Sequence, residues 1–344
     1  MSMACPRMRV LCAPGAMLSW LGRQGTRAVA ALVFIGIAMP SIGALLKPWV
    51  TEAIFVLLCI AFLRLDLAVF RRYLGRPTII LAATAWTSLV ILAVFGACYL
   101  AFGLKAHSAD LFVALMLQAM ASPMMASPAL AALMGLDATL VLVTLVTSTA
   151  LIPFTAPVFA SAFIGRGLRL SPMALGLKLL GILAGSALVG VTGRRMAGPA
   201  AIERYADEIN GWNILVLFVF VAAVMENVAA RLFATPLLTI GVAALAFVVF
   251  FAVLGLTTLL FAWAGRERAF VLGLMASQRN MGLMLAATGG ALPDLAWLYF
   301  ALSQFPIYLS PQLLQPLARQ LAAQTQATPE PVRGRNPCPD EQQD

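Results

Sequence analysis

The chain has 344 residues, of which 62% are hydrophobic and 11% charged, and its mean hydropathy is +0.93. Ordinary soluble domains carry roughly 25% charged residues, so this chain has too few polar side chains to cover a water-soluble globule. A soluble domain, a nucleic-acid-binding protein and a disulfide-stapled secreted module are therefore excluded. The net charge of +9 indicates arginine-rich cytoplasmic loops of a membrane protein rather than a nucleic-acid partner.

The chain offers little material for metal binding or acid–base catalysis. Its five cysteines are odd in number and scattered, and His107 is its single histidine. No H-E-x-x-H or G-x-S-x-G motif and no pair of intramembrane aspartates occurs. We therefore expect no metal, no cofactor and no enzymatic activity.

Apolar runs bounded by charged residues predict ten transmembrane helices, because about 20 apolar residues cross a bilayer. The spans are roughly 28–46, 48–63, 77–103, 110–134, 137–164, 171–192, 211–230, 233–264, 269–291 and 294–318. Residues 1–27 are expected to form a cytoplasmic N-terminal segment. Residues 319–344, rich in Gln, Pro and charge, are expected to form a disordered cytoplasmic tail.

The distribution of Lys and Arg predicts the orientation of these spans. The segments on the side of the N-terminus hold Arg7, Arg9, Arg23, Arg27, Arg64, Arg71, Arg72, Arg76, Arg194, Arg195, Arg204, Arg266, Arg268, Arg319, Arg333 and Arg335. The segments on the other side hold only Lys47, Lys105, Arg166, Arg169 and Arg231. Because Lys and Arg concentrate in cytoplasmic loops, both termini are predicted to be cytoplasmic, in a bacterial inner (plasma) membrane.

Ten spans divide into two repeats of five, 28–165 and 166–318. An odd number of spans per repeat inserts the second copy upside down relative to the first, which is a common plan of secondary transporters. The fold expected is therefore an all-α integral membrane protein with two inverted five-helix repeats.

The fourth span of each repeat carries signals for a broken helix. In the first repeat, residues 120–128 read Met-Ala-Ser-Pro-Met-Met-Ala-Ser-Pro, and each proline removes an amide donor and clashes with the preceding turn. In the second, residues 275–282 read Met-Ala-Ser-Gln-Arg-Asn-Met-Gly, which places three polar side chains where lipid cannot solvate them. Helices four and nine are therefore predicted to be broken and to line a cavity near the middle of the membrane.

These interruptions and the fifth span supply the candidate binding residues. The predicted substrate- or ion-binding set is Arg279, Gln278, Asn280, Ser277, Ser122, Ser127, Ser148 and Thr149. Arg279 either binds an anionic substrate or holds the carbonyls freed by the break. Each serine or threonine hydroxyl either contributes a ligand or bonds back to its own helix.

Several of these residues resemble the bile acid:sodium symporter family, within the superfamily that also contains arsenite and auxin carriers. The similarity to spans four and five of that family lies in Ser127, Gly135-Leu136-Asp137, Ser148-Thr149 and the segment from Pro153 to Pro157. Asn280-Met281-Gly282-Leu283 looks like the end of its Glu-x-x-x-Gln-Asn-x-Gly-Leu stretch in span nine. The resemblance covers about 28–318 and implies a ten-span transporter.

The chain departs from the family at the positions that bind sodium. The family's Ser-Asn pair of span four is Ser127-Pro128 here, its glutamate falls on Met275 and its glutamine on Arg279. The resemblance therefore implies a transporter, while these substitutions remove most of the oxygen ligands that sodium would need.

The function expected is secondary transport of an organic anion or oxyanion by alternating access, with a lipid bilayer and a small anionic substrate as partners. A proton or sodium remains as the coupling ion, with Glu226 and Glu52 as proton sites, although surface pairing of Glu226 with Arg231 and of Glu52 with Lys47 is favoured. The alternatives are an ordinary sodium symporter and a receptor or channel-like membrane protein that does not transport.

Overall fold

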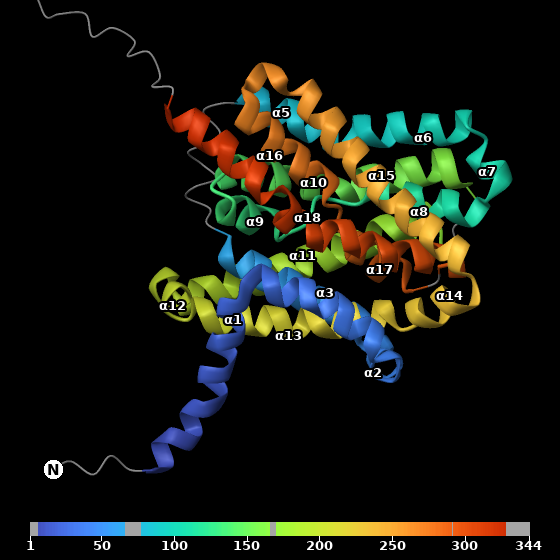
Figure 1. Ribbon diagram of the computed structural model, residues 1–344. Helices are drawn as coiled ribbons and strands as arrows, with labels where there is room; N and C mark the ends of the chain where they lie inside the picture. The colour runs from blue at the N-terminus through green and yellow to red at the C-terminus, as the bar shows by residue number, and fades with distance from the viewer. Residues whose placement is uncertain (1–5, 66–76, 166–169, 291, 328–344) are drawn as a thin grey trace, which may run out of the picture.

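A computed structural model describes residues 6–65, 77–165, 170–290 and 292–327 (Figure 1). These residues form helices, and the one extended pairing among them is an isolated bridge between Pro123 and Arg279. Within these described ranges, six helices are long and apolar enough to cross a membrane: Pro40–Arg64, Thr78–Ala101, Ala138–Ile164, Pro172–Ala197, Ala206–Ala234 and Pro236–Leu260. The chain is thus an all-α integral membrane protein.

The first predicted repeat is a series of α-helices that includes two π-helical turns. Its helices are α1 (Pro6–Ala38), α2 (Pro40–Leu46), α3 (Val50–Arg64), α5 (Pro77–Ala85), α6 (Ile91–Ala101), α7 (Leu104–His107), α8 (Ala109–Met120), α9 (Ser127–Leu133) and α10 (Ala138–Phe159). A π-helical turn, Trp86–Val90, joins α5 to α6, and a second, Ala160–Ile164, follows α10. The short 3-10 helix Lys47–Trp49 joins α2 to α3.

The second predicted repeat contains the remaining helices. They are α11 (Pro172–Ala197), α12 (Pro199–Arg204), α13 (Ala206–Met225), α14 (Val228–Ala234), α15 (Pro236–Leu260), α16 (Arg266–Ser277), α17 (Met281–Thr288) and α18 (Asp294–Ala327). The 3-10 helix Ala262–Ala264 leads from α15 into α16.

Helical structure extends beyond the spans predicted at both ends of the chain. α1 begins at Pro6, within the predicted N-terminal segment, and ends at Ala38, because Pro40 starts the separate helix α2. α18 continues past 318 to Ala327, so the first residues of the predicted disordered tail are helical. Residues 328–344, the rest of that tail, lie outside the described residues, as do residues 1–5.

Both predicted helix interruptions are present. α8 ends at Met120 and α9 begins at Ser127, and Pro123 lies between them. α16 ends at Ser277, and α17 begins at Met281 under the cap of Asn280, whose Oδ1 accepts a hydrogen bond from the amide of Leu283.

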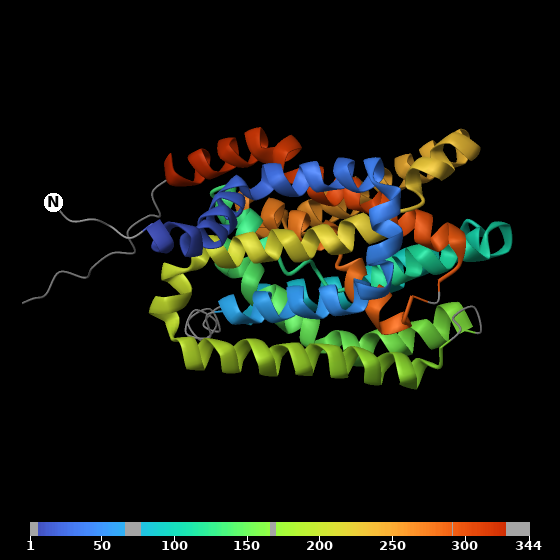
Figure 2. The same cartoon turned by 90° about the horizontal axis from the view of Figure 1, so that it is seen from below.

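The helices pack in two groups with a cavity between them. α1 packs along α13, and α3 packs against both α11 and α13. α1, α3 and α13 lie in the lower part of Figure 1, with α11 at mid-height, and Figure 2 shows the molecule from below. In the second group, α15 packs on α16 and α18, while α10 contacts α5 and α9.

The two ends of the bundle carry different loops. α2, α7 and α14 lie together at one end, and α12 and the C-terminal end of α18 lie at the opposite end (Figure 1). Lys47, Lys105 and Arg231 are therefore at the first end and Arg204 is at the second.

Candidate functional site

The two helix interruptions cross and bond to each other through their backbones. The amide of Met124 donates to the carbonyl of Gln278 at 2.7 Å, and the amide of Asn280 donates to the carbonyl of Ser122, also at 2.7 Å. Pro123 and Arg279 thus lie opposite each other in a one-rung antiparallel bridge. Non-helical backbone inside a membrane protein needs internal partners, and each interruption supplies them to the other. We call residues 121–126 and 278–280 the crossing.

Helix ends with partial positive charge and helix ends with partial negative charge meet at the crossing. The C-terminal ends of α8 and α16 carry partial negative charge, and the N-terminal ends of α9 and α17 carry partial positive charge. A cation can therefore be held by the carbonyls and an anion by the N-terminal amides.

Arg279 supplies a positive charge at this point. Its side chain is only 3% exposed. Its Nη1 donates to the carbonyl of Ala121 at 2.8 Å, beyond the last residue of α8, and to the carbonyl of Thr87 at 3.2 Å. Thr87 lies in the π-helical turn Trp86–Val90, and such turns are frequent at functional sites.

One edge of the Arg279 guanidinium remains free. Nε and Nη2 are buried and have no hydrogen-bond partner among the described residues. These two nitrogens form the side of the planar fork that binds a carboxylate or another oxyanion through parallel N–H donors. The carbonyls thus fix the guanidinium through Nη1 and leave its buried Nε–Nη2 edge without a partner among the described residues.

Gln278 holds the crossing to its surroundings. Ser127 Oγ donates to its Oε1 at 2.9 Å, and its Nε2 donates to Ser310 Oγ of α18 at 3.3 Å. Because both ends of this buried amide are bonded to protein, Gln278 acts as a structural link between α9, the crossing and α18.

The other predicted residues differ in how they relate to the crossing. Ser148 lies within 3.0 Å of Thr87, measured between their hydroxyl oxygens, so it supports the turn that holds Arg279. Ser277 donates back to the carbonyl of Leu274 in its own helix. Ser122 and Thr149 are buried, and their hydroxyls have no partner among the described residues.

A cavity of about 740 Å³ lies between the two groups of helices. Of the eight predicted binding residues, only Arg279 and Asn280 line it. Most of its wall is apolar, contributed by α3, α9, α13 and α18. Its polar lining includes Asn210, Asn213 and Gln304, together with Arg64, whose buried Nη2 has no partner in the described part of the chain.

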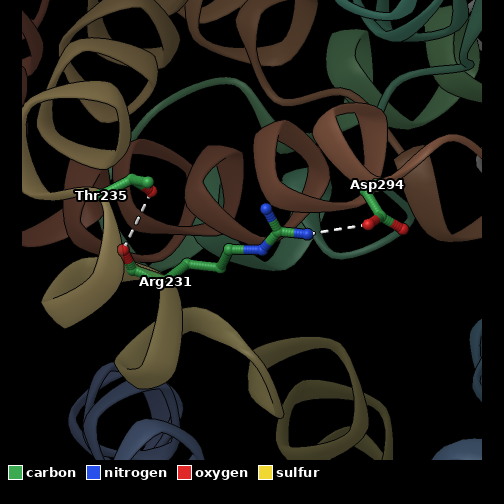
Figure 3. A network of polar contacts seen from close by, with 3 residues as sticks. All are labelled: Arg231, Thr235 and Asp294. Carbon is green, nitrogen blue, oxygen red and sulfur yellow. Dashed lines mark hydrogen bonds and ion pairs between the residues drawn. The ribbon is translucent and has the colours of Figure 1, made fainter.

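Charged side chains link neighbouring helices at the α2–α14 end, and two of their contacts reach α18. Lys47 pairs with Glu226 at 2.8 Å, and its Nζ lies 5.6 Å from the ring centre of Trp297 in α18. Arg231 pairs with Asp294 at 2.8 Å, while its carbonyl accepts from Thr235 Oγ1 (Figure 3). The predicted pairings of Lys47 with Glu52 and of Arg231 with Glu226 are therefore wrong.

Sequence reasoning missed Thr87, Ser310 and the cavity residues of α13. Thr84, Thr87 and Ser88 form a hydroxyl cluster inside an apolar span, and that cluster was the available signal. Thr84 in turn lies 2.7 Å from Thr147 between hydroxyl oxygens. Neither Asn210 nor Ser310 stands out from the sequence, because only tertiary packing brings Asn210 to the cavity and Ser310 to Gln278 of the crossing.

Neither protein-family models nor curated proteins match the chain.

Proposed function

We propose that this protein is a secondary transporter that moves an organic anion or oxyanion across the membrane by alternating access. The observation that carries the proposal is the buried Arg279 guanidinium, held by the carbonyls of Ala121 and Thr87 and without a partner among the described residues along its Nε–Nη2 edge. The same residue lines a cavity large enough for a small organic molecule. A fixed cation at this point favours an anion and repels a cation.

Helix packing supports the proposed inverted repeat. If α1, α3, α5–α6, α8–α9 and α10 correspond in order to α11, α13, α15, α16–α17 and α18, exchanging the halves converts one observed contact into another. α1 on α13 becomes α11 on α3, and α10 on α11 becomes α18 on α1. Likewise α8 on α18 becomes α16 on α10, and α5 on α10 becomes α15 on α18.

The distribution of charge over the two ends supports the proposed orientation. Lys47, Lys105 and Arg231, all assigned to outer loops, lie at the end with α2, α7 and α14. At that end Arg231 of α14 pairs with Asp294 of α18, and Lys47, paired with Glu226, contacts Trp297 of α18. The cavity lining extends toward Gly22 and Arg23 of α1 and Asn210 of α13, on the side assigned to the cytoplasm. In our proposal this is an inward-facing state with its outer end closed.

We further propose that the chain is a divergent member of the bile acid:sodium symporter family. The crossing of two interrupted helices in spans four and nine supports this relationship. Met275, which stands at the position of the family's glutamate, is a fully packed residue of α16, 1% exposed. In this proposal, the positions that supply oxygen ligands for sodium in the family are replaced here by the nitrogen donors of Arg279, which bind an anion.

Ligand binding and uptake test the proposed function. Detergent-solubilised protein is screened by thermal unfolding against p-toluenesulfonate, octanoate, succinate, sulfate and phosphate, since a bound anion stabilises the folded state. Uptake of radiolabelled p-toluenesulfonate and sulfate is then measured in proteoliposomes. We expect at least one anion to raise the unfolding temperature and one labelled anion to accumulate.

Variants of Arg279 test whether this residue is the binding group. Arg279→Gln should weaken anion binding by about tenfold to a hundredfold, because a charge-assisted hydrogen bond contributes roughly 1.5–3 kcal/mol. Arg279→Lys should restore only part of the affinity, because lysine lacks the planar fork. Arg204→Gln, at the exposed last residue of α12, is the matched control. No anion-induced stabilisation and no uptake by folded wild-type protein would contradict the proposed function.

A further inference from the structure

We propose that the protein is an obligatory anion exchanger, which carries an anion in both directions of its cycle and returns only slowly when empty. This inference rests on the proposed function and adds its mode of coupling. The feature behind it is the state of Arg279 without a bound anion: a buried positive charge with unpartnered donors on two nitrogens.

Within the described part of the chain, no acidic side chain pairs with Arg279. The ion pairs among the described residues join Arg23 to Asp207, Lys47 to Glu226 and Arg231 to Asp294, and none includes Arg279. Its hydrogen-bond partners in the described ranges are two neutral carbonyls, both on Nη1. An anion on the Nε–Nη2 edge would therefore be the counter-charge.

Alternating access passes through a state in which the site is closed to water on both sides. In that state an empty site keeps a charged group and its N–H donors away from both water and protein acceptors, which is energetically costly. An anion on the same edge removes the net charge and satisfies the donors. The loaded protein should therefore cross this state much faster than the empty one.

In this proposal Arg279 takes the place that a coupling cation would have at the crossing. A cation bound here would need backbone carbonyls as ligands. The carbonyls of Ala121, after the end of α8, and of Thr87 already accept hydrogen bonds from Arg279. A second positive charge beside the guanidinium would be repelled. The species that drives the return step is therefore a second anion.

Counterflow in proteoliposomes tests this inference. Initial uptake of radiolabelled p-toluenesulfonate and of labelled sulfate is measured into vesicles loaded with the same unlabelled anion and into vesicles without it. Sodium is replaced by choline at constant ionic strength. We expect uptake into loaded vesicles to be at least about tenfold faster, since buried unpartnered donors are costly, and to be unchanged by choline.

Two Arg279 variants separate the effect of charge from a general loss of activity. The readout is the ratio of loaded to unloaded uptake at saturating substrate, so a slower protein is not mistaken for an altered mechanism. Arg279→Gln removes the buried charge, and its ratio should fall close to one. Arg279→Lys keeps the charge and should keep a high ratio, as should the control Arg204→Gln.

The outcomes also distinguish this inference from the proposed function. Equal uptake into loaded and unloaded vesicles, or uptake that rises steeply with sodium, would overturn exchange while leaving anion transport in place. A ratio that stays high in Arg279→Gln would show that exchange does not depend on the buried charge and would overturn the inference. Absence of both uptake and anion binding in the folded wild type would instead remove the transporter itself.

Discussion

Gln278 is the residue through which the crossing is tied to the rest of the protein. Its side-chain oxygen accepts from Ser127 and its nitrogen donates to Ser310, so one buried amide links α9 with α18. Its backbone carbonyl also accepts the amide of Met124 across the crossing. Although the sequence predicts it as a ligand, its amide is already bonded to protein on both sides.

Ser127→Ala tests this structural role. The substitution removes the donor to Gln278 Oε1 and should lower the free energy of unfolding by about 1 kcal/mol, within the range measured for hydrogen bonds between membrane helices. Chemical unfolding in mixed micelles measures the change. Ser161→Ala is the control, because the exposed Ser161 hydroxyl bonds only to its own helix at Val158. Equal effects of the two substitutions would mean that the Ser127–Gln278 bond contributes no stability.

The sequence predicts which residues are chemically unusual but not how they are paired. Arg279 is identifiable because an arginine inside an apolar span costs about 2.5 kcal/mol or more. Its partners are backbone carbonyls of Ala121 and Thr87, and every residue has a carbonyl. Only the tertiary path of the chain decides which of them is left without a helical donor.

The two prolines near the first interruption have different roles at the level of the helix. Pro128 lies in the first turn of α9, where an amide donor is not needed. Pro123 lies inside the interruption, opposite Arg279. An amide at position 123 would help α8 to continue as a helix, so Pro123 is the residue that keeps this segment extended.

Pro123→Ala should therefore reduce anion uptake severalfold while the protein still inserts and purifies. The reason is that the extended segment, which bonds to Gln278 and Asn280, would compete with added helical turns. Uptake in proteoliposomes, normalised to inserted protein, measures the effect. Pro236→Ala, at the exposed first turn of α15, is the matched control. Wild-type uptake by Pro123→Ala would show that the interruption does not need this proline.

At the level of elements, hydropathy identifies apolar runs well and helix ends less well. The interruptions at 121–126 and 278–280 were predictable, because proline and clustered polar side chains are local signals. The extension of α1 back to Pro6 and of α18 to Ala327 was not, because those turns are too polar to be counted as membrane spans. The π-helical turn at Trp86–Val90 also has no local signature, since its residues suit an ordinary helix.

Across the whole molecule, two ion pairs close the end opposite the cavity mouth. Arg231–Asp294 connects α14 to α18, and Lys47, which pairs with Glu226 of the α13 end, also lies over the ring of Trp297 in α18. Both pairs are partly exposed, and Asp294 is 85% exposed, so they contribute little to folding. Their effect is expected on the balance between two arrangements of the helix groups, where small free energies change populations.

Reversing one charge should open this end. Asp294→Arg places two guanidinium groups side by side, and their repulsion should separate α14 from α18. The readout is a cysteine substituted for the buried Ala301, which lies beside Arg231 and Asp294. This cysteine should react severalfold faster with an impermeant maleimide in the Asp294→Arg background. The double variant Arg231→Asp with Asp294→Arg should restore slow labelling, because the attraction is rebuilt. Asp207→Arg, in the ion pair with Arg23 near the other end, is the control. Unchanged labelling in Asp294→Arg would exclude this pair as part of the closure.

The fixed charge of Arg279 also has an electrical consequence. A transmembrane voltage acts on each elementary charge that crosses, by about 2.3 kcal/mol per 100 mV. With a monovalent anion on Arg279, the moving site is neutral overall, so the exchange of two monovalent anions transfers no net charge. The exchange of a divalent anion for a monovalent one transfers a single charge, and the voltage would then set its direction. The charges of the two exchanged anions, and not the gradient of a coupling cation, would therefore decide whether the membrane potential drives this exchange.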